Sequence, residues 1–260
     1  MQAGLCAIRF KMSDSLQVFN RRIVRRHRDR AAARLSDHDF LFVESADRLV
    51  NRLGDVTRIF PLALDLGCHG GELARALAGT GKVATLVKAD LSPAMAARAK
   101  PLATAADEEL LPFADGVFDL VVSNLNLHWV NDLPGALAQI LRTLKPDGLF
   151  LAAVLAGKTL IELRHALSEA EIIEESGLSP RVSPFADVCE LDGLLVRVGF
   201  ALPVADADNL TVSYDDPMKL MTDLRGMGES NAVELRRPGF TRRSTMEAAA
   251  EIYCRQFGDD

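Results

Sequence analysis

The sequence predicts an α/β fold in which a mostly parallel sheet carries helices on both faces. Two observations support this prediction. Between residues 59 and 157, short apolar runs alternate with amphipathic helical segments, and a glycine-rich turn follows the first run. Such alternation builds parallel strands joined by right-handed crossovers. The length of 260 residues fits one large domain of this class.

The elements of this region follow in a regular order. Apolar runs bounded by turn residues predict strands at 62–66, 83–89, 118–123 and 149–155, and a further strand ending near Ala106. Helical spacing predicts helices at 72–78, 93–100 and 133–144. Ser92 is the expected N-cap of the second helix, and Pro93 lies in its first turn. Residues 144–148 are expected to form the turn into the last of these strands.

The rest of the chain has a mostly helical pattern. We expect residues 1–58 to form a helical cover, 59–157 the core, and 158–260 an extension of helices and strands that completes the same domain. Within the extension, the pattern predicts a strand pair at 202–204 and 210–214 and a helix at 245–257. Met12 offers an alternative start, which leaves open whether residues 1–11 belong to the ordered protein.

Composition and charge exclude several classes of protein. The net charge is −6 and aromatic residues make up 6%, so we expect no nucleic-acid partner. No apolar run reaches the roughly 18 residues of a membrane span, so no transmembrane segment is predicted. The four cysteines stand far apart without the spacing of a zinc site. This favours reduced thiols, no metal and a cytoplasmic location.

Residues 15–35 contain seven arginines with apolar residues at helical spacing among them. This pattern predicts a basic amphipathic helix. Its arginines either form the solvated face of a helix that covers the domain, or dock an acidic partner or a membrane surface.

The first strand-to-helix turn reads Asp65-Leu66-Gly67-Cys68-His69-Gly70-Gly71-Glu72. In an open parallel sheet a ligand lies at the carboxyl ends of the strands, and glycines let the backbone approach it closely. Asp90 ends the next strand, where a carboxylate can accept hydrogen bonds from a ribose diol. We therefore expect a nucleoside-containing cofactor at this turn, with Cys68 and Leu91 beside it.

Two cofactors use this arrangement. A dinucleotide requires glycine at positions 67, 69 and 72, of which only Gly67 is present, and Glu72 would repel a pyrophosphate. S-adenosylmethionine (SAM) tolerates glycine at 67, 69 and 71, of which two are present. SAM carries a sulfonium and an ammonium, which Asp65 favours electrostatically. The sequence therefore predicts SAM, and the alternative is a structural turn in another α/β fold.

Polar residues near two later strand ends extend the expected pocket. Asp107, followed by Glu108, lies where the third strand should end, and its carboxylate can accept a hydrogen bond from an adenine amino group. Asn124 and His128 follow the fourth strand, near the position of the reactive methyl group. His128 is the candidate for acid–base chemistry or substrate contact. The alternative is that His128 and Trp129 pack as a pair that lines the cofactor pocket.

Together these segments resemble class I SAM-dependent methyltransferases, over about residues 60–155, which implies their Rossmann-like sheet. A closer resemblance, over roughly residues 16–250, is to the mitochondrial complex I assembly factors of the protein arginine hydroxylase type. It rests on Val18–Arg21, Pro61–Cys68, Leu127–Pro134, Leu160–Arg164, Ser179–Phe185 and Met221–Asn231. It implies a bacterial relative of those factors, with a respiratory complex subunit as a partner and a place at the periphery of the inner membrane. The biotin-synthesis enzymes that methylate malonyl-carrier protein are also similar, but match the last two segments less well.

The sequence departs from the family pattern in two places. His69 replaces the usual glycine, which either tightens the pocket or forces Gly70 into the special backbone conformation instead. Class I relatives close the sheet with an antiparallel C-terminal strand, whereas Thr245–Phe257 has helical spacing. We therefore expect a sheet that lacks its last C-terminal strand.

The resemblance implies a SAM-dependent enzyme that transfers a methyl group to an unidentified protein or small-molecule acceptor, or that acts in respiratory complex I assembly. Methyl transfer needs little beyond positioning, so the lack of a catalytic triad is no objection. Arginine hydroxylation by a non-haem iron would require two histidines and a carboxylate, and the five histidines show no such spacing. Three alternatives stay open: malonyl-carrier-protein O-methyl transfer, arginine hydroxylation, and a non-catalytic SAM-binding assembly factor.

Overall fold

The sheet of the protein, seen in a computed structural model that describes residues 17–258, has five parallel strands. Their order is β3-β2-β1-β4-β5, and they comprise β1 (Phe60–Leu66), β2 (Val83–Asp90), β3 (Ala103–Ala105), β4 (Phe118–Asn124) and β5 (Leu144–Ala153). The α/β class is confirmed. The strand order reverses between β1 and β4, which puts the topological switch point at their carboxyl ends. Residues 1–11 and Met12 lie outside the described residues.

Helices cover both faces of the sheet. On one face, α2 (Phe40–Gly54) and α3 (Glu72–Leu77) pack on Ala63, Leu120 and Val122. On the other, α5 (Leu133–Thr143) and α7 (Val188–Val198) pack on Leu64 and Val121. Neighbouring strand residues point to opposite faces, so the two cores share the same strands. The short helix α4 (Pro93–Arg98) begins at Ser92, whose side chain accepts a hydrogen bond from the backbone N–H of Met95, as the sequence predicted.

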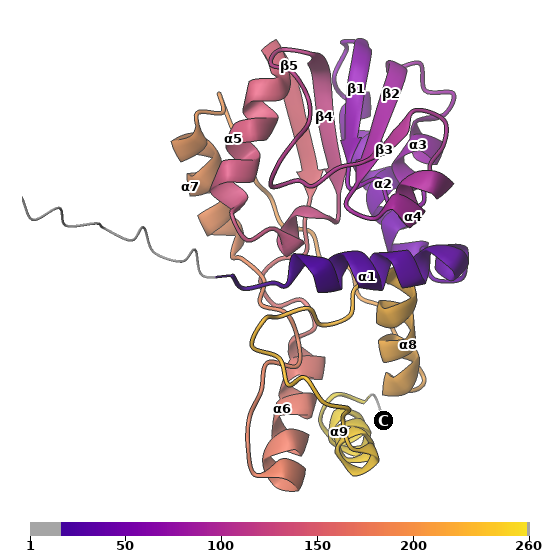
Figure 1. Cartoon of the computed structure of the whole chain (residues 1–260), viewed down its shortest axis with the longest axis vertical. Helices are drawn as coiled ribbons and strands as arrows, with labels where there is room; N and C mark the ends of the chain where they lie inside the picture. The colour runs from indigo at the N-terminus through magenta and orange to yellow at the C-terminus, as the bar shows by residue number, and fades with distance from the viewer. Residues whose placement is uncertain (1–16, 259–260) are drawn as a thin grey trace, which may run out of the picture.

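The N-terminal helix lies across the carboxyl edge of the sheet. Figure 1 shows α1 (Arg21–Ala31) beneath the tips of the strands, between the sheet and a lower group of helices. The side chain of Asn20 caps it, accepting a hydrogen bond from the backbone N–H of Ile23. The basic helix predicted at 15–35 is thus shorter, and a 3-10 helix η1 (Ala32–Asp37) continues it. The position of α1 makes it a wall of whatever binds at the strand ends.

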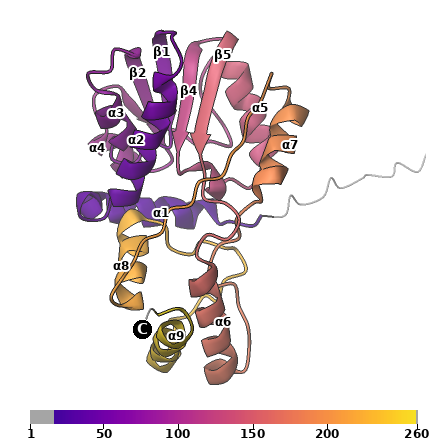
Figure 2. The same ribbon diagram turned by 180° about the vertical axis from the view of Figure 1, so that it is seen from behind.

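Three further helices lie below α1. They are α6 (Ile161–Glu175), α8 (Pro217–Met227) and α9 (Arg243–Phe257), grouped apart from the sheet in Figures 1 and 2. Leu163, Ala166 and Ala170 of α6 pack on Ala249 and Ile252 of α9. The helix predicted at 245–257 is confirmed.

The strand pair predicted at 202–204 and 210–214 is wrong. Residues 201–216 contain no strand and run as an extended connection from α7 to α8 (Figure 2). Asp206 pairs with Arg52 at 2.8 Å and Asp208 pairs with Arg48, which holds this segment along α2 instead of in the sheet. Leu202 is 93% exposed, so the alternation of apolar residues there does not mark a buried face. Among residues 17–258 no strand pairs with the outer edge of β5, as expected of a sheet without its closing strand.

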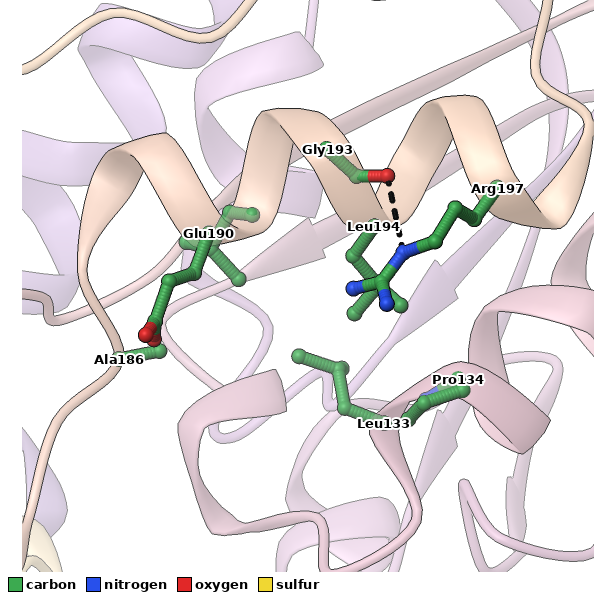
Figure 3. A pocket seen from close by; sticks show the side chains of 8 residues that line it. Leu133, Pro134, Ala186, Glu190, Gly193, Leu194 and Arg197 are labelled. Carbon is green, nitrogen blue, oxygen red and sulfur yellow. Dashed lines mark hydrogen bonds between the residues drawn. The ribbon is translucent and has the colours of Figure 1, made fainter.

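A groove of about 610 Å³ opens on the surface between α5 and α7 (Figure 3). Leu133 and Leu194 line it, and the Nε of Arg197 donates a hydrogen bond to the carbonyl of Gly193 at 3.3 Å. None of the predicted site residues lines this groove. The candidate site therefore lies elsewhere, at the strand ends beneath which α1 runs.

Candidate functional site

The glycine turn after β1 adopts the backbone that the sequence requires. Gly67 and Gly71 have φ values of +79° and +87°, in the left-handed region that favours glycine. A Cβ added to Gly67 would overlap the side chain of Asn126, so only glycine fits there. His69 itself adopts φ +45°, whereas Gly70 does not have a positive φ. The alternative that His69 transfers the special conformation to Gly70 is therefore wrong.

The His69 ring is turned into the protein. It stacks on Phe42 with ring centroids 4.0 Å apart, and its Nε2 lies 3.0 Å from the carbonyl oxygen of Asn124. Burial, and then the charge of Arg28, lowers the pKa of His69 to about 4. The ring is therefore neutral at physiological pH and stabilises the turn by packing and one hydrogen bond.

Asp65 ends β1 as a fully buried carboxylate. Neither of its oxygens has a hydrogen-bond partner among the described residues. Burial, and then the nearby charges of Glu72 and Asp90, raises the pKa of Asp65 well above its usual range. A buried carboxylate without partners is costly, so this position calls for a donor that the described residues do not supply.

Asp90 is held by the backbone around it. Its carboxylate accepts hydrogen bonds from the N–H of His69 at 3.1 Å and of Ser92 at 2.7 Å. The guanidinium of Arg28 lies 3.6 Å from its Oδ1. Burial raises the pKa of Asp90, and Arg28 and the two backbone hydrogen bonds act against this. The predicted ribose-binding carboxylate is thus fixed at the end of β2.

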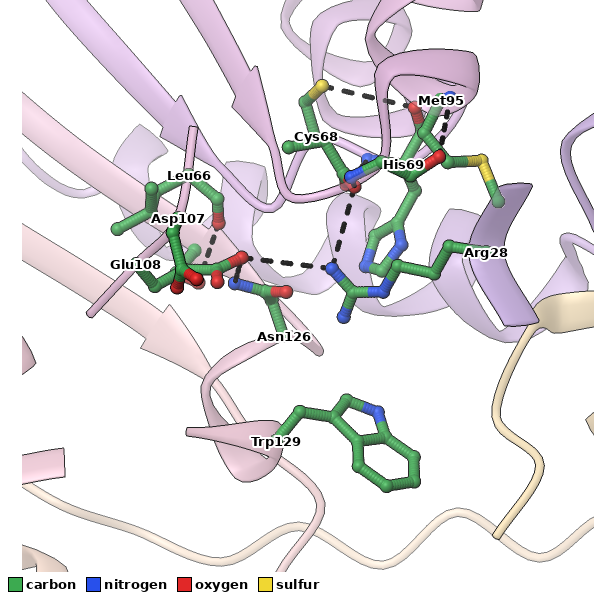
Figure 4. Close-up of polar contacts among 12 residues, drawn as sticks. Arg28, Leu66, Cys68, His69, Met95, Asp107, Glu108, Asn126 and Trp129 are labelled. Atoms are coloured by element: carbon green, nitrogen blue, oxygen red, sulfur yellow. Dashed lines mark hydrogen bonds and ion pairs between the residues drawn. The ribbon is translucent and has the colours of Figure 1, made fainter. Parts of the chain in front are cut away.

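Two arginines of α1 enter the site, and the sequence analysis missed both. Arg28 is fully buried, and its guanidinium lies 3.6 Å from Asp90. It also lies 3.7 Å from Glu108 (Figure 4). All three of its nitrogens lack hydrogen-bond partners. Arg21 pairs with Asp107 at 2.7 Å and with Glu108. The sequence did contain a signal for these two arginines. Arg21 and Arg28 lie on the same stripe of the helix as Val24 and Ala31, which are buried.

Asn124, which was predicted to line the pocket, and Asn126, two residues later, point in different directions. The amide of Asn124 donates a hydrogen bond to the carbonyl of Phe42 at 2.9 Å, so this side chain turns toward α2. Its Oδ1 is buried without a partner. Asn126 lies over Gly67 instead, and its Nδ2 donates to Glu108 at 2.9 Å (Figure 4). Asn126 is therefore the amide nearest the glycine turn.

Cys68 and Leu91 complete the set of predicted pocket residues. The Cys68 thiol is buried, and burial, followed by the charge of Asp65, raises its pKa well above the usual range. It is therefore a packing group and not a thiolate. Leu91 is half-buried and packs with Phe19 and Trp129. Both side chains belong to the walls around the strand ends.

His128 and Trp129 meet a carboxylate from the far end of the chain. In η2 (Leu127–Trp129), Nε2 of His128 lies 3.0 Å from Oε2 of Glu229, and the indole N–H of Trp129 donates to the same oxygen at 2.7 Å. Burial acts to raise the pKa of Glu229, but the interactions with His128, Arg28 and His69 together outweigh it, so the pKa is lowered. The Oε1 of Glu229 is buried without a partner. Sequence reasoning missed Glu229 because it lies 101 positions from His128.

A cavity of about 450 Å³ adjoins this group and is lined by residues of α6, α8 and α9 and of the loops beside them. Trp129 and Glu229 form part of its wall, as do Arg181, Arg225, Arg236 and Arg237. The rest of the lining is mainly apolar and comes from Leu155, Leu160, Leu163, Leu167, Met221, Leu224 and Met246. A largely apolar cavity with a few polar groups is typical of a small-molecule or side-chain binding site.

The segment around Phe19, at the start of the described residues, connects the segments around Asn131 and Val233. The backbone N–H of Phe19 donates to Oδ1 of Asn131 at 2.8 Å, and Nδ2 of Asn131 donates back to the Phe19 carbonyl at 3.1 Å. Phe19 also bridges Val233 in antiparallel fashion. Segments around residues 19, 131 and 233 thus converge beside the cavity.

Comparison with known proteins shows the family. A family model described as a methyltransferase domain matches residues 64–152. The mitochondrial arginine-hydroxylase NDUFAF5 of Danio rerio is 42% identical and covers 96% of this chain and 80% of its own length. A malonyl-[acyl-carrier protein] O-methyltransferase of Halorhodospira halophila is 37% identical, covering 92% of this chain and 83% of its own length. The chain belongs to the class I SAM-dependent methyltransferase family.

The solved structures agree with this methyltransferase fold. A putative methyltransferase from Haloferax volcanii, in complex with the Trm112 activator, matches with a TM-score of 0.58 at 20% identity. The match covers 88% of this chain and 93% of the archaeal one. At this identity the likeness shows the fold alone.

SAM is the cofactor of this methyltransferase family, and the residues at the strand ends fit it. The unpartnered oxygens of Asp65 call for a hydrogen-bond donor and the unpartnered nitrogens of Arg28 for an acceptor. SAM can satisfy the two kinds of group, because its ammonium can donate to a carboxylate and its ribose hydroxyls and adenine nitrogens can accept from a guanidinium. When bound, SAM supplies an electrophilic methyl group on its sulfonium.

The predicted cytoplasmic location of this methyltransferase is wrong. The arginine-hydroxylase relatives of Danio rerio, man and mouse, at 42–43% identity, are all mitochondrial proteins, which points away from the cytoplasm. Cysteine spacing indicates only a reducing compartment and cannot tell one such compartment from another. Among residues 17–258, no helix is long and apolar enough to cross a membrane.

Proposed function

We propose that this enzyme uses SAM to modify an arginine side chain of a protein acceptor, a subunit of a respiratory complex. The acceptor arginine enters the 450 Å³ cavity and meets Glu229 at its inner wall. The names of the relatives support the choice of side chain, since arginine-hydroxylases of five organisms match at 35–43% identity. By analogy with those relatives, the acceptor protein would lie in mitochondria or, in a bacterium, at the inner membrane.

The proposed cofactor site follows the strand ends. Asp65, Gly67, Cys68 and Gly71 surround the amino-acid part of SAM at the turn after β1. Asp90 accepts hydrogen bonds from the ribose, with Leu91 packed beside it. Asp107 and Glu108 hold the adenine end, and Asn124 belongs to the wall at the tip of β4. Support comes from the burial of Asp65, Asp90 and Glu108, each of which is 0% exposed.

The observation that carries the acceptor proposal is the buried, half-satisfied carboxylate of Glu229. One oxygen is fully used by His128 and Trp129, whereas the other is buried without a partner in a residue that lines the cavity. The lowered pKa keeps this carboxylate ionised. A buried charge needs a partner of opposite sign, and a guanidinium can donate to a carboxylate through its planar fork of N–H groups.

His128 acts in this proposal through Glu229. Its side chain is 3% exposed, and its ring lies 5.5 Å from that of Trp129 and 5.9 Å from that of Phe185. The ring fixes the orientation of Oε2 and so aims Oε1 at the cavity. His128 is thus a positioning residue, and Glu229 is the group that touches the acceptor.

The experiment is a transfer assay on candidate acceptors. Purified protein is incubated with methyl-labelled SAM and arginine-containing peptides of respiratory complex subunits, and mass spectrometry reads the gain of a methyl group on arginine. Glu229→Gln should lower modification by about tenfold or more while SAM binding is retained. Glu234→Gln, at an exposed position, is the matched control.

Two results would overturn the proposal. One is modification that does not depend on Glu229. The other is transfer only to the malonyl thioester of a carrier protein, which would place the chain with the O-methyltransferase relatives instead.

A further inference from the structure

Four arginines meet where α1 crosses the end of α8, and we name them the cationic cluster: Arg26, Arg30, Arg225 and Arg236. Arg26 and Arg30 lie one turn apart on α1, and Arg225 lies in the last turn of α8. The two helices meet closely at Gly228, where an added Cβ would lie 3.2 Å from the Cα of Arg28. The backbone therefore brings Arg26, Arg30 and Arg225 to one junction, and Arg236 lines the same cavity as Arg225.

No carboxylate in the described part of the chain lies within ion-pair distance of any arginine of the cationic cluster. Two other arginines that line the same cavity do have carboxylate partners. Arg181 pairs with Glu171 at 2.7 Å, and Arg237 pairs with Glu175. Arg225 and Arg236 line that cavity without such partners, and Arg236 only donates to the carbonyl of Val233 at 3.1 Å. The cluster is an uncompensated concentration of positive charge.

The positive charges of the cluster act on one another and on a histidine between them. The pKa of His27 is lowered to about 4 by burial and then by Arg30, with Arg236 and Arg26 adding to the effect. The pKa of Arg30 is lowered by burial and then by Arg225 and Arg26. Because like charges held together destabilise a fold, an anionic partner gains free energy by neutralising them. The chain as a whole carries −6, so the cluster does not reflect general basicity.

The cluster and the proposed acceptor position share one cavity. Arg225 and Arg236 line it together with Glu229, whose buried Oε1 has no partner. Ser230 follows Glu229 in the chain and also lines the cavity, and its carbonyl oxygen lies 3.1 Å from Nδ1 of His27. An occupant of the cavity therefore meets the negative Glu229 and the positive Arg225 and Arg236 in its lining.

We infer that the cationic cluster docks an acidic segment of the acceptor protein, whose carboxylates bind the arginines while the side chain to be modified reaches Glu229. The identity of that side chain rests on the proposed function, whereas the docking of an acidic segment does not. A protein segment fits better than a membrane because Arg225 and Arg236 line a concave cavity, and the net negative charge opposes approach to a flat anionic surface.

The experiment measures binding of a glutamate-rich peptide that contains no arginine to the full chain with SAM present. Fluorescence anisotropy is recorded at low and high salt for the wild type, for the double variant Arg225→Glu/Arg236→Glu, and for Arg197→Glu/Arg243→Glu. The control changes the net charge equally at exposed positions outside the cluster. We expect the cluster variant to bind at least about tenfold more weakly at low salt, and the difference to shrink at high salt.

Equal binding by the two double variants would overturn the inference, as would stronger binding to vesicles of anionic lipid than to the peptide. If substitution of the half-buried Arg236 prevents folding, Arg26→Glu/Arg225→Glu replaces it, since both side chains are exposed. Because the peptide carries no arginine, its binding is independent of the reaction. Peptide binding that persists without any arginine modification would count against the proposed function alone.

Discussion

The guanidinium of Arg28 lies 3.6 Å from Oδ1 of Asp90, and neither side chain is exposed. This pair joins the N-terminal helix to the end of β2, so α1 is part of the site and not only a cover. The same guanidinium lies 3.7 Å from Glu108. The acids at two successive strand ends are thus oriented by one cation from outside the sheet.

Asp90→Ala should weaken SAM binding by about 1–3 kcal/mol, because the ribose loses its carboxylate acceptor. Isothermal titration calorimetry measures this directly. Asp115→Ala, at a side chain that is 75% exposed, should leave the affinity unchanged. An unchanged affinity in Asp90→Ala would contradict the assignment of the ribose site.

Arg28→Met should destabilise the fold by about 3–5 kcal/mol in the absence of SAM, since it removes one partner of a buried ionic group and leaves Asp90 without its cation, whereas Glu108 keeps Arg21. Urea unfolding measures the change. Arg25→Met is the control, because that side chain is 54% exposed and its ion pair with Asp29, at 3.7 Å, lies at the surface. A loss below about 1 kcal/mol would mean that the charge of Asp90 is neutralised by other means.

The pH dependence of stability should reveal the buried His69. Its pKa is about 4 in the fold, against about 6.5 in an unfolded chain. Between these values the unfolded chain binds the proton and the folded one does not, so stability falls as the pH drops from about 6.5 to 4. At the lower end of this range, the loss of unfolding free energy that is due to this ring amounts to roughly 3 kcal/mol.

The comparison of variants isolates this contribution from the carboxylates. His69→Asn suits the left-handed backbone at this position and removes the titrating ring. Its unfolding free energy should fall less steeply than that of the wild type over this pH range, whereas His165→Asn, at a 56% exposed side chain, should follow the wild type. Parallel curves for His69→Asn and the wild type would mean that the ring titrates normally.

The parts of the site that the sequence could predict depend on local pattern. Asp65, Gly67 and Asp90 lie at strand ends that hydrophobic runs and a glycine turn mark directly. Arg28 and Glu229 reach the site through tertiary contacts with residues 62 to 101 positions away, which no local pattern encodes. The buried stripe of α1 could have indicated Arg21 and Arg28, because a charge on an apolar stripe needs a partner.

The error at 202–214 has a similar cause. Apolar residues alternate there with polar ones, which is typical of a strand. However, two aspartates in the same stretch pair with arginines of α2, and the segment runs along that helix and not in the sheet.

The helices below α1 depend on a buried ionic group around Glu171, which is 2% exposed. Its carboxylate accepts hydrogen bonds from the N–H of Ser179 at 2.8 Å and from Arg181 at 2.7 Å. Burial acts to raise its pKa, but Arg181 and Ser179 outweigh this and lower it. The depressed pKa means that the stabilisation is present above the unfolded value and is lost as the pH falls through the folded one.

Glu171→Gln should therefore destabilise the lower helices by about 1–3 kcal/mol at neutral pH, since Arg181 keeps Glu175 at 3.4 Å as a second partner. Hydrogen exchange should show faster opening of α6 and α9, with little change in the five-stranded sheet. Glu247→Gln breaks an exposed pair with Arg243 and should cost no more than about 0.5 kcal/mol. Equal effects of the two substitutions would mean that burial adds nothing to the Glu171 group. Uniform acceleration of exchange across the sheet would mean that the lower helices do not open separately from the core.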